Sequence, residues 1–424
     1  MAETLLKASS YPNRGLEHLT VFDKAAWNIH WPVLYVFKSP MPSNQVLKSA
    51  LSQVLVHFPH LAGRLTTDRR SILLNNAGIR VIERCVPTTL AQELPFDAST
   101  DVSHLLPAVE GVEELFQIQF SRYVCGSLVM GLTYHHYVAD AQSMSYFAVA
   151  WARLVRGLAI HPLPCHERDS VLAPRTNLRI DFDHKLIEFK KTESALIFSS
   201  SFEYLTTHFS VEFINNLKAK VNQSNQKKYS TFECLLAHVW KTVTHSRGLA
   251  LHEFTQIKLS VNGRSRMKPV VPMAYFGNLV LWAYPRLRVR NLLMESYAYV
   301  AQAIHEAVAV IDDNYLKSFI DFGELCKRNN EELRGTMPET TTLCPNLEVE
   351  SWLTFKLHNL DFGGGRPFTI YSPNAPAEGL LIFASSCREE GGIDAHISLF
   401  PQHAHHFKQI CHSLYHHQSL SSKI

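Results

Sequence analysis

Residues 127–140 read SLVMGLTYHHYVAD and join two regular elements whose patterns are clear in the sequence. The apolar run at 127–134 is typical of a buried strand, and residues 141–156 carry apolar side chains at helical spacing. His136 and Asp140 therefore lie on a short turn between a strand and a helix. Because rigid elements hold such turns in place, catalytic side chains concentrate there. The apolar face of the predicted helix consists of Met144, Phe147, Ala148, Trp151 and Leu154.

His136 is the candidate general base on this turn. A histidine with an ordinary pKa of about 6.5 is largely uncharged at neutral pH and can accept a proton. The spacing H-x-x-x-D proves little by itself, because a chain with 23 histidines contains about one such match by chance. A structural histidine, satisfied by a neighbouring hydrogen bond, is the alternative interpretation.

The composition excludes several classes of protein. With 46% hydrophobic and 19% charged residues, the chain of 424 residues is typical of a globular protein with two or three domains. A net charge of +3 gives no basis for a nucleic-acid or membrane partner. We expect no membrane span, because no run of about 18 apolar residues occurs, and the N-terminus lacks the apolar core of a secretory signal. The resulting expectation is a cytoplasmic monomer that binds small-molecule substrates.

Neither the cysteines nor the histidines indicate a metal site. The eight cysteines are scattered without a C-x-x-C pair, which argues against a zinc ribbon or a disulfide framework and favours reduced thiols. Cys125, the cysteine nearest to His136 in sequence, is predicted to lie in the core. Six histidines cluster near the C-terminus, but no cysteine or carboxylate set completes a tetrahedral shell at recognisable spacing, so we predict no bound metal. These histidines are His403, His405, His406, His412, His416 and His417.

Strand and helix patterns alternate along the whole chain, which predicts a mixed α/β protein. Residues 43–57 are predicted to form an amphipathic helix that Pro59 ends. Residues 72–82 read as a strand, a turn and a strand. Further helices are expected at 211–221 and 230–246, where apolar stripes would pack on a sheet.

A change of composition divides the chain into two halves. Between residues 159 and 177 the sequence becomes rich in proline, arginine and other polar residues, which marks the beginning of a linker. We predict a first domain at 1–175, a crossover loop at 176–201 and a second domain at 202–424.

Five short segments together resemble the plant BAHD acyl-CoA-dependent acyltransferases. The H-x-x-x-D motif lies in mid-chain, and residues 361–367 read DFGGGRP where the family usually has D-F-G-W-G. The other segments are LAGRL at 61–65, VNGRSR at 261–266 and YFGN at 275–278. All of them occur in the family's order across nearly the whole chain. Gly364 stands where the family usually has tryptophan, although the amine-acylating branch tolerates other residues there.

The resemblance implies an α/β fold with two similar chloramphenicol-acetyltransferase-like domains, each with a mixed β-sheet and helices. An active-site channel would run between the domains, and His136 would open onto it from the first domain. Domain interfaces commonly bind large two-part ligands. Acyl-CoA would be the co-substrate, and no cofactor would be permanently bound.

The resemblance also implies roles for the motif residues. Acyl transfer from a thioester needs a base to take the proton of the acceptor, and His136 would supply it. Asp140 would form a structural salt bridge. Asp361, the motif position of the second signature, would be structural as well and would pair with Arg264. The glycines that let backbones approach closely would be Gly363 and Gly365.

Glu348 and Glu350 lie in the segment EVESW at 348–352, which has strand character. Residues two apart in a strand project from the same face, so the two carboxylates repel each other unless a cation lies between them. A solvated strand edge is the alternative interpretation. The resemblance favours acceptor binding, because agmatine-acylating relatives carry acids at both positions, whereas shikimate-using relatives carry threonine at the position of Glu350. Trp352 would wall the pocket.

These residues and the resemblance predict an acyl-CoA-dependent N-acyltransferase. The enzyme would move a hydroxycinnamoyl group, such as p-coumaroyl, to a cationic amine such as agmatine or putrescine. Glu348 and Glu350 would hold the distal charge while His136 deprotonates the reacting nitrogen. Two alternatives stay open: an O-acyltransferase for an alcohol such as shikimate or quinate, and a non-catalytic binder with the same fold, which Gly364 makes conceivable.

Overall fold

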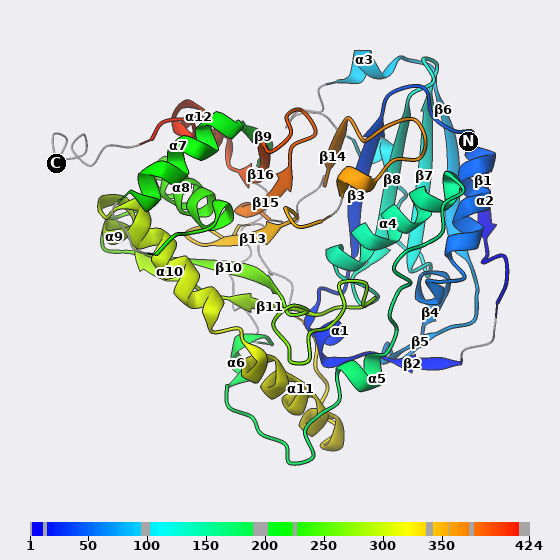
Figure 1. The fold of residues 1–424 in the computed structure, drawn as a ribbon, viewed down its shortest axis with the longest axis horizontal. Coiled ribbons are helices and arrows are strands. Elements are labelled where there is room, and N and C mark those ends of the chain that lie inside the picture. The colour runs from blue at the N-terminus through cyan, green and yellow to red at the C-terminus, as the bar shows by residue number, and fades with distance from the viewer. Residues whose placement is uncertain are drawn as a thin grey trace.

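Two large β-sheets lie side by side in the computed structural model, and helices pack on both of them (Figure 1). The structure describes residues 2–11, 15–94, 102–189, 202–223, 227–335, 342–355, 357–372 and 377–414. Among these residues, no helix is both long and apolar enough to cross a membrane.

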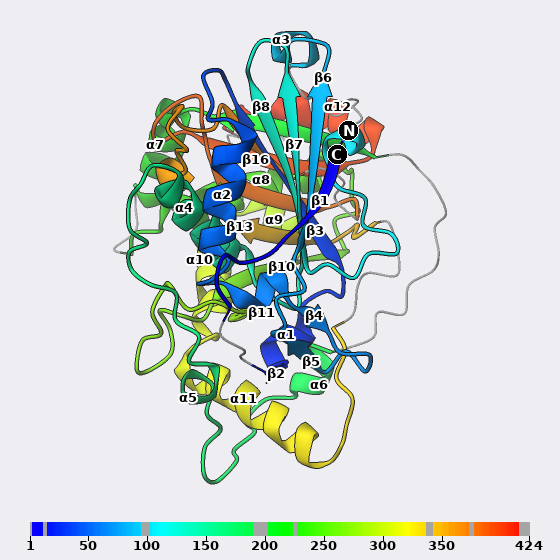
Figure 2. The same cartoon turned by 90° about the vertical axis from the view of Figure 1, so that its right-hand side faces the viewer.

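The first sheet contains six strands in the described part of the chain, in the order β1-β6-β7-β8-β3-β14 (Figure 2). The neighbours β6 and β7 pair in parallel, and the other neighbours are antiparallel. All eight residues of β8 are buried, as expected for a central strand with an apolar sequence. The strands are β1 (Ala2–Leu6), β3 (His30–Phe37), β6 (Ile79–Val86), β7 (Phe116–Tyr123), β8 (Leu128–His135) and β14 (Thr369–Tyr371).

The second sheet is also mixed, with the order β11-β10-β13-β15-β16-β9 and with β12 paired to β10. The central pairs β10 with β13 and β13 with β15 are parallel, and the others are antiparallel. The strands are β9 (Glu203–Phe209), β10 (Phe254–Asn262), β11 (Val280–Ala283), β12 (Arg286–Arg288), β13 (Leu347–Ser351), β15 (Leu380–Ser385) and β16 (Ile393–Leu399).

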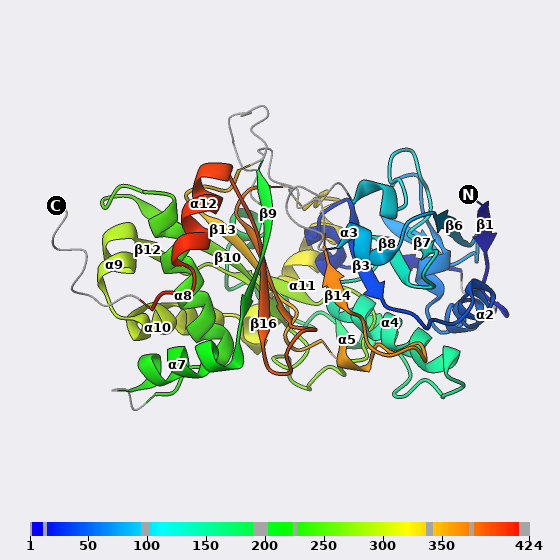
Figure 3. The same cartoon turned by 90° about the horizontal axis from the view of Figure 1, so that it is seen from above.

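Helices form one layer on each sheet. On the first sheet, α2 (Asn44–Val54) packs against α4 (Ala141–Val155). On the second, α8 (Thr231–Ser246) is the central helix and contacts four others. Figure 3 shows that this second layer lies on the side of its sheet that faces away from the first half. The four helices around α8 are α7 (Val211–Asn222), α9 (Val289–Met294), α10 (Tyr297–Ala309) and α12 (Pro401–Ile410).

The long helix α11 and several shorter elements lie along the lower edge of the molecule in Figure 1. There α1 (Val21–Ala25) contacts α11 (Asp313–Arg328), which joins the N-terminal and C-terminal halves. A small sheet has the order β2-β5-β4. The remaining elements are β2 (Leu16–His18), β4 (Arg64–Leu65), β5 (Ser71–Leu73), α3 (Leu90–Glu93), α5 (Arg168–Val171), α6 (His184–Ile187), η1 (Pro59–Ala62), η2 (Ser103–Leu105) and η3 (Leu357–Asn359).

The elements predicted from periodicity are present. The helices expected at 43–57, 211–221 and 230–246 are α2, α7 and α8, and the strand and helix around the H-x-x-x-D turn are β8 and α4. The predicted strands within 72–82 also form, as β5 and β6, but they do not pair with each other. They belong to different sheets.

The two halves of the chain share the first sheet. The edge strand β14 comes from the second half and pairs with β3. Residues 190–201 of the predicted crossover lie outside the described residues. The domain boundaries at 175 and 201 therefore stay a prediction.

Candidate active site

A cavity of about 790 Å³ lies between the two halves. Its walls come from the β8–α4 turn of the first half and from β10, β11 and β13 of the second, together with the loop after α1. The cavity brings together five of the side chains that the sequence singled out, since it is lined by His136, Asp140, Glu348, Glu350 and Trp352.

His136 directly follows β8 and is fixed by its backbone. Its N–H donates to the Ile29 carbonyl at 2.9 Å, and its own carbonyl accepts from Asn278 Nδ2 at 2.9 Å. The ring is partly buried and meets Trp31 edge-on, with the ring centroids 6.3 Å apart. Burial lowers the pKa of His136 below the ordinary histidine value, and the Asp140 carboxylate partly offsets this shift. The imidazole is thus uncharged at neutral pH and chemically able to take a proton.

Asp140 is held in place by an arginine from the other half. It caps the N-terminus of α4 by accepting from Ser143 N at 2.9 Å. Its carboxylate also accepts two hydrogen bonds from the Arg264 guanidinium, at 2.8 and 3.0 Å, and one from Leu279 N at 3.1 Å. Both side chains are almost fully buried. With these four hydrogen bonds the carboxylate forms a buried salt bridge, as the family resemblance implied for Asp140.

The prediction that Asp361 pairs with Arg264 is wrong. Asp361 lies 3.8 Å from Arg156 in a partly exposed ion pair. Its Oδ1 accepts hydrogen bonds from the backbone N–H groups of Gly363 and Gly365, at 2.7 and 2.9 Å, so the carboxylate stabilises the loop to which it belongs. The Arg264 guanidinium instead donates to groups around the N-terminus of α4, among them Asp140, Ser143 and the Gly277 carbonyl.

The Asp361 segment packs outside the cavity. None of residues 361–365 is among the described residues that line it. Phe362 is buried against Trp151 and Phe37, at ring-centroid distances of 4.7 and 5.5 Å. A Cβ atom on Gly364 would lie 1.9 Å from the Pro40 carbonyl oxygen. The replacement of the family's tryptophan by Gly364 therefore affects how this loop packs against Pro40, and position 364 is not part of the cavity wall.

Gly363 and Gly365 meet a conformational requirement. Their φ angles are +102° and +100°, a region that favours glycine. Around Gly365 a Cβ atom would meet nothing within 4 Å, and around Gly363 only the Arg156 side chain at 4.0 Å. The close backbone approach predicted for both glycines occurs instead at Gly364.

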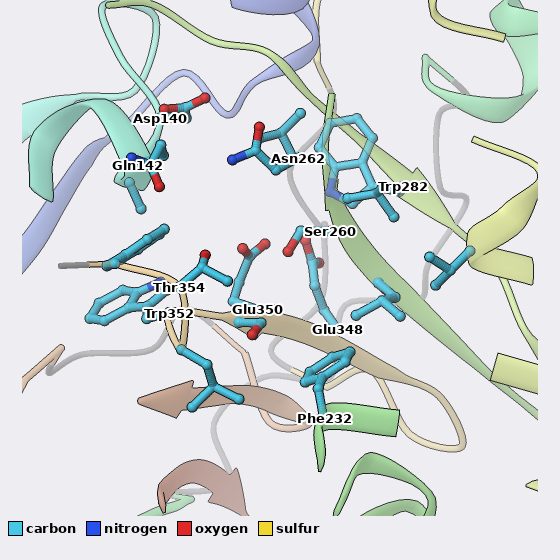
Figure 4. A pocket seen from close by; sticks show the side chains of 18 of the residues that line it. Asp140, Gln142, Phe232, Ser260, Asn262, Trp282, Glu348, Glu350, Trp352 and Thr354 are labelled. Carbon is cyan, nitrogen blue, oxygen red and sulfur yellow. The ribbon is translucent and has the colours of Figure 1, made fainter. Parts of the chain in front are cut away.

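Glu348 and Glu350 project from β13 into the cavity, toward Ser260 on the neighbouring strand (Figure 4). Glu348 is buried and pairs with Lys258, whose Nζ lies 2.9 Å from Oε1. Burial, with the charge of Glu348, raises the pKa of Glu350 to about 7, although a hydrogen bond from Ser260 opposes the shift. The two acids thus differ: Glu348 is matched by the protein's own cation, and Glu350 is not.

Aromatic side chains form much of the remaining wall. Trp352 is buried and packs on Phe355 with its ring centroid 6.1 Å away. A narrower apolar recess adjoins the cavity and shares Tyr134 and Trp352 with it. The other aromatic residues of the cavity are Phe22, Trp27, Trp31, Tyr229, Phe232 and Trp282.

A buried polar network that sequence reasoning missed supports the His136 turn. Asn278 donates to both the His136 carbonyl and the Asp23 carboxylate, at 2.9 and 2.8 Å. Asp23 is fully buried and pairs with Arg168 at 2.8 Å. Asn278 ends the YFGN segment at 275–278, for which the sequence indicated no role. The spacing of Thr20 and Asp23 is that of a helix capping box, which is the sequence signal for Asp23.

Lys258 and Ser260 were also missed, although the sequence holds a signal for them. In β10 the polar side chains recur at every second position, which places Lys258, Ser260 and Asn262 on one face. That face meets the carboxylates of β13, because Lys258 and Glu348 are register partners in the parallel pair of strands.

The prediction that Cys125 lies in the core is wrong. The cysteine is exposed, because it belongs to the short loop 124–127 that connects β7 to β8 at the end opposite His136. The C-terminal histidines divide between α12, the residues just after it and, for His416 and His417, the undescribed end. Within the described ranges, no three histidine, cysteine or acidic side chains are arranged to hold a metal ion.

Comparisons with known proteins extend over nearly the whole chain. A model described as the Transferase family matches residues 1–414. Tryptamine hydroxycinnamoyltransferase 2 of Oryza sativa subsp. japonica is 45% identical over 410 residues, which cover 93% of this chain and 93% of that protein. Agmatine coumaroyltransferase-1 of Hordeum vulgare is 40% identical over 408 residues, again 93% of each. The crystal structure of vinorine synthase superposes with a TM-score of 0.74 at 21% identity, over 96% of this chain and 95% of that one, which confirms the predicted two-unit α/β fold.

Proposed function

The chain belongs to the BAHD transferase family, and from this premise we propose that it moves a hydroxycinnamoyl group from CoA to a cationic amine such as agmatine or putrescine. At the coarser level it is an acyl-CoA-dependent amine N-acyltransferase. Acyl-CoA is the co-substrate.

His136 is the proposed general base. The uncharged imidazole accepts a proton from the amine as the nitrogen attacks the thioester carbonyl carbon. The carbon–sulfur bond then breaks, CoA leaves as a thiolate, and the imidazolium returns the proton to that sulfur. The products are an amide and free CoA, and no acyl-enzyme forms. The support for this role is that His136 lines the cavity on a turn fixed by Ile29 and Asn278.

The acceptor preference rests on one observation: Glu350 is a cavity carboxylate that forms no ion pair with any residue in the described part of the chain, whereas Glu348 beside it pairs with Lys258. A carboxylate in such a place attracts a cation and repels a carboxylate. An acceptor whose distal end is a guanidinium or ammonium group would neutralise Glu350. Shikimate and quinate, which carry a carboxylate, would meet repulsion. Arg334, which lies between α11 and β13, is exposed and pairs with Glu332, so it does not offer a cation to such an acid.

The acyl group would lie against apolar walls. The recess beside Trp352 has a volume of only about 20 Å³, so a flat phenylpropenoyl ring would lie in the main cavity, against aromatic side chains such as Phe232 and Trp352. This lining supports an aromatic acyl donor over acetyl-CoA.

An aromatic monoamine is the second candidate acceptor, favoured by the tryptophans of the cavity. Trp27, Trp31 and Trp282 offer surfaces on which an indole or phenol ring would stack. The 45% identical relative is named for tryptamine, and the 40% identical one for agmatine.

An acceptor panel tests the proposal. Purified enzyme and p-coumaroyl-CoA would be incubated with agmatine, putrescine, tryptamine and shikimate in turn, and kcat/KM determined from CoA release and product mass. The proposal expects agmatine or putrescine to give the highest value. A higher value for tryptamine would favour the second candidate, and preference for shikimate would overturn N-acylation.

A further inference from the structure

Lys258 occupies an ammonium-binding site built by its own chain. Its Nζ lies 2.9 Å from Glu348 Oε1, 4.4 Å from the centroid of the Trp282 ring and 5.4 Å from that of Trp27. Two indole faces and a carboxylate are the surroundings that bind alkylammonium ions in proteins. All three of these partners line the cavity.

The position of Lys258 follows from strand register. Lys258 and Glu348 are partners in the parallel pair of β10 and β13, and Glu350 is two residues further along β13 on the same face. Lys258 therefore stands next to both acids, and its side chain retains 26% exposure. A charge that is partly accessible and this close to the cavity influences any ion bound there.

The charged wall, made of the cavity-lining Glu348 and Glu350 together with the adjacent Lys258, consequently carries one net negative charge when both acids are ionised. Without Lys258 it would carry two. The other lining acid near His136, Asp140, is neutralised by Arg264 and adds nothing to this balance.

We propose that Lys258 determines acceptor specificity, by matching the pocket to amines that carry one cationic group besides the reacting nitrogen. This inference rests on the proposed function and refines it. Agmatine and putrescine have one such group, tryptamine has none and spermidine has two. The lysine thus disfavours spermidine, and the one net negative charge that remains favours agmatine and putrescine over tryptamine.

A charge series tests the proposal with Lys258→Met, Glu348→Gln and the double variant. Relative to the wild type, the first makes the wall more negative by one charge, the second makes it neutral, and the double variant restores one net negative charge. The measurement is the ratio of kcat/KM between acceptors, with p-coumaroyl-CoA as donor. Ratios cancel any general loss of activity.

The expected changes have opposite signs. In Lys258→Met the ratios of spermidine to agmatine and of agmatine to tryptamine each rise by about fivefold or more, and in Glu348→Gln they fall by a similar factor. In the double variant they return to within about twofold of the wild type, because the net charge is the same. Lys258→Arg keeps the charge, so its acceptor ratios should also stay within about twofold of those of the wild type.

Two outcomes overturn the inference. Equal loss for all acceptors would show that Lys258 acts only on the fold, and constant ratios across the series would show that its charge does not reach the acceptor. If Lys258→Met does not fold, the double variant and Glu348→Gln still give the comparison, because in neither does the Glu348 carboxylate remain without its lysine. Failure of the wild type to acylate any amine would instead overturn the proposed function itself.

Discussion

Both terminal nitrogens of Arg264 donate hydrogen bonds to the Asp140 carboxylate, at 2.8 and 3.0 Å, and so connect the second half of the chain to the turn that carries His136. The same guanidinium reaches the carbonyl groups of Tyr275 and Gly277, at 3.1 and 3.0 Å. The turn that positions His136 is thereby held by residues from both halves.

The first prediction concerns this buried pair. Asp140→Asn leaves Arg264 charged and uncompensated in the interior, so we expect the free energy of unfolding to fall by about 3–5 kcal/mol. The value of kcat should fall as well, because the His136 turn loses its anchor. Denaturant unfolding and steady-state kinetics measure both effects.

Asp361→Asn is the matched control. It removes only a partly exposed ion pair at 3.8 Å and leaves the Oδ1 acceptor for the two glycines, so its cost should stay below about 1 kcal/mol. A larger loss in Asp361→Asn than in Asp140→Asn would contradict the assignment of Arg264 to Asp140.

The second prediction concerns Glu350. Glu350→Gln keeps the shape of the side chain and removes its charge, and we expect kcat/KM for agmatine to fall by at least about tenfold. The value for tryptamine should change less, because a neutral aromatic tail does not need the charge. Glu350→Thr should act in the same direction with little effect on melting temperature. Unchanged agmatine kinetics in both variants would show that Glu350 does not contact the acceptor.

The third prediction is a pH dependence of agmatine binding. Burial raises the pKa of Glu350 to about 7, so below that pH the carboxyl group is protonated and must lose its proton before it can pair with a guanidinium. The KM for agmatine should therefore fall as the pH rises through 7, and below 7 it should rise by up to about tenfold per pH unit. In Glu350→Gln this component should vanish. The same slope in both proteins would assign the titration to another group.

The fourth prediction concerns Gly364. Any side chain there overlaps the Pro40 carbonyl oxygen and Met41 Sδ, at 1.9 and 2.8 Å from the Cβ position, so Gly364→Ala should cost about 1–3 kcal/mol of stability. Activity per folded molecule should persist, because this loop lies outside the cavity wall. Gly111→Ala offers a control for the steric effect: its φ of +71°, unlike the φ of Gly364, itself disfavours a side chain, but no atom lies within 4 Å of the added carbon, so Gly364→Ala should cost more. A Gly364→Trp protein as stable as the wild type would refute the steric account.

Local pattern predicted much of the fold and part of the site. Helical spacing located α4, and period-two alternation placed Glu348 and Glu350 on one face. Their partners could not be derived in this way. The contact of Arg264 with Asp140 spans 124 residues of sequence, and the chain offers two motif aspartates, of which the resemblance indicated the wrong one. The pairing of Lys258 with Glu348 depends on the register of two parallel strands that are separated by α9, α10 and α11 in sequence.

Substitution of His136 tests the central claim most directly. With p-coumaroyl-CoA and agmatine, His136→Ala should release CoA more slowly than the wild type by a factor of about 100 to 10,000, while its melting temperature stays close to that of the wild type. The adjacent His135 bonds to Arg69 instead, so His135→Ala should keep far more turnover. A folded His136→Ala enzyme that releases CoA within about tenfold of the wild-type rate would contradict proton transfer by this imidazole.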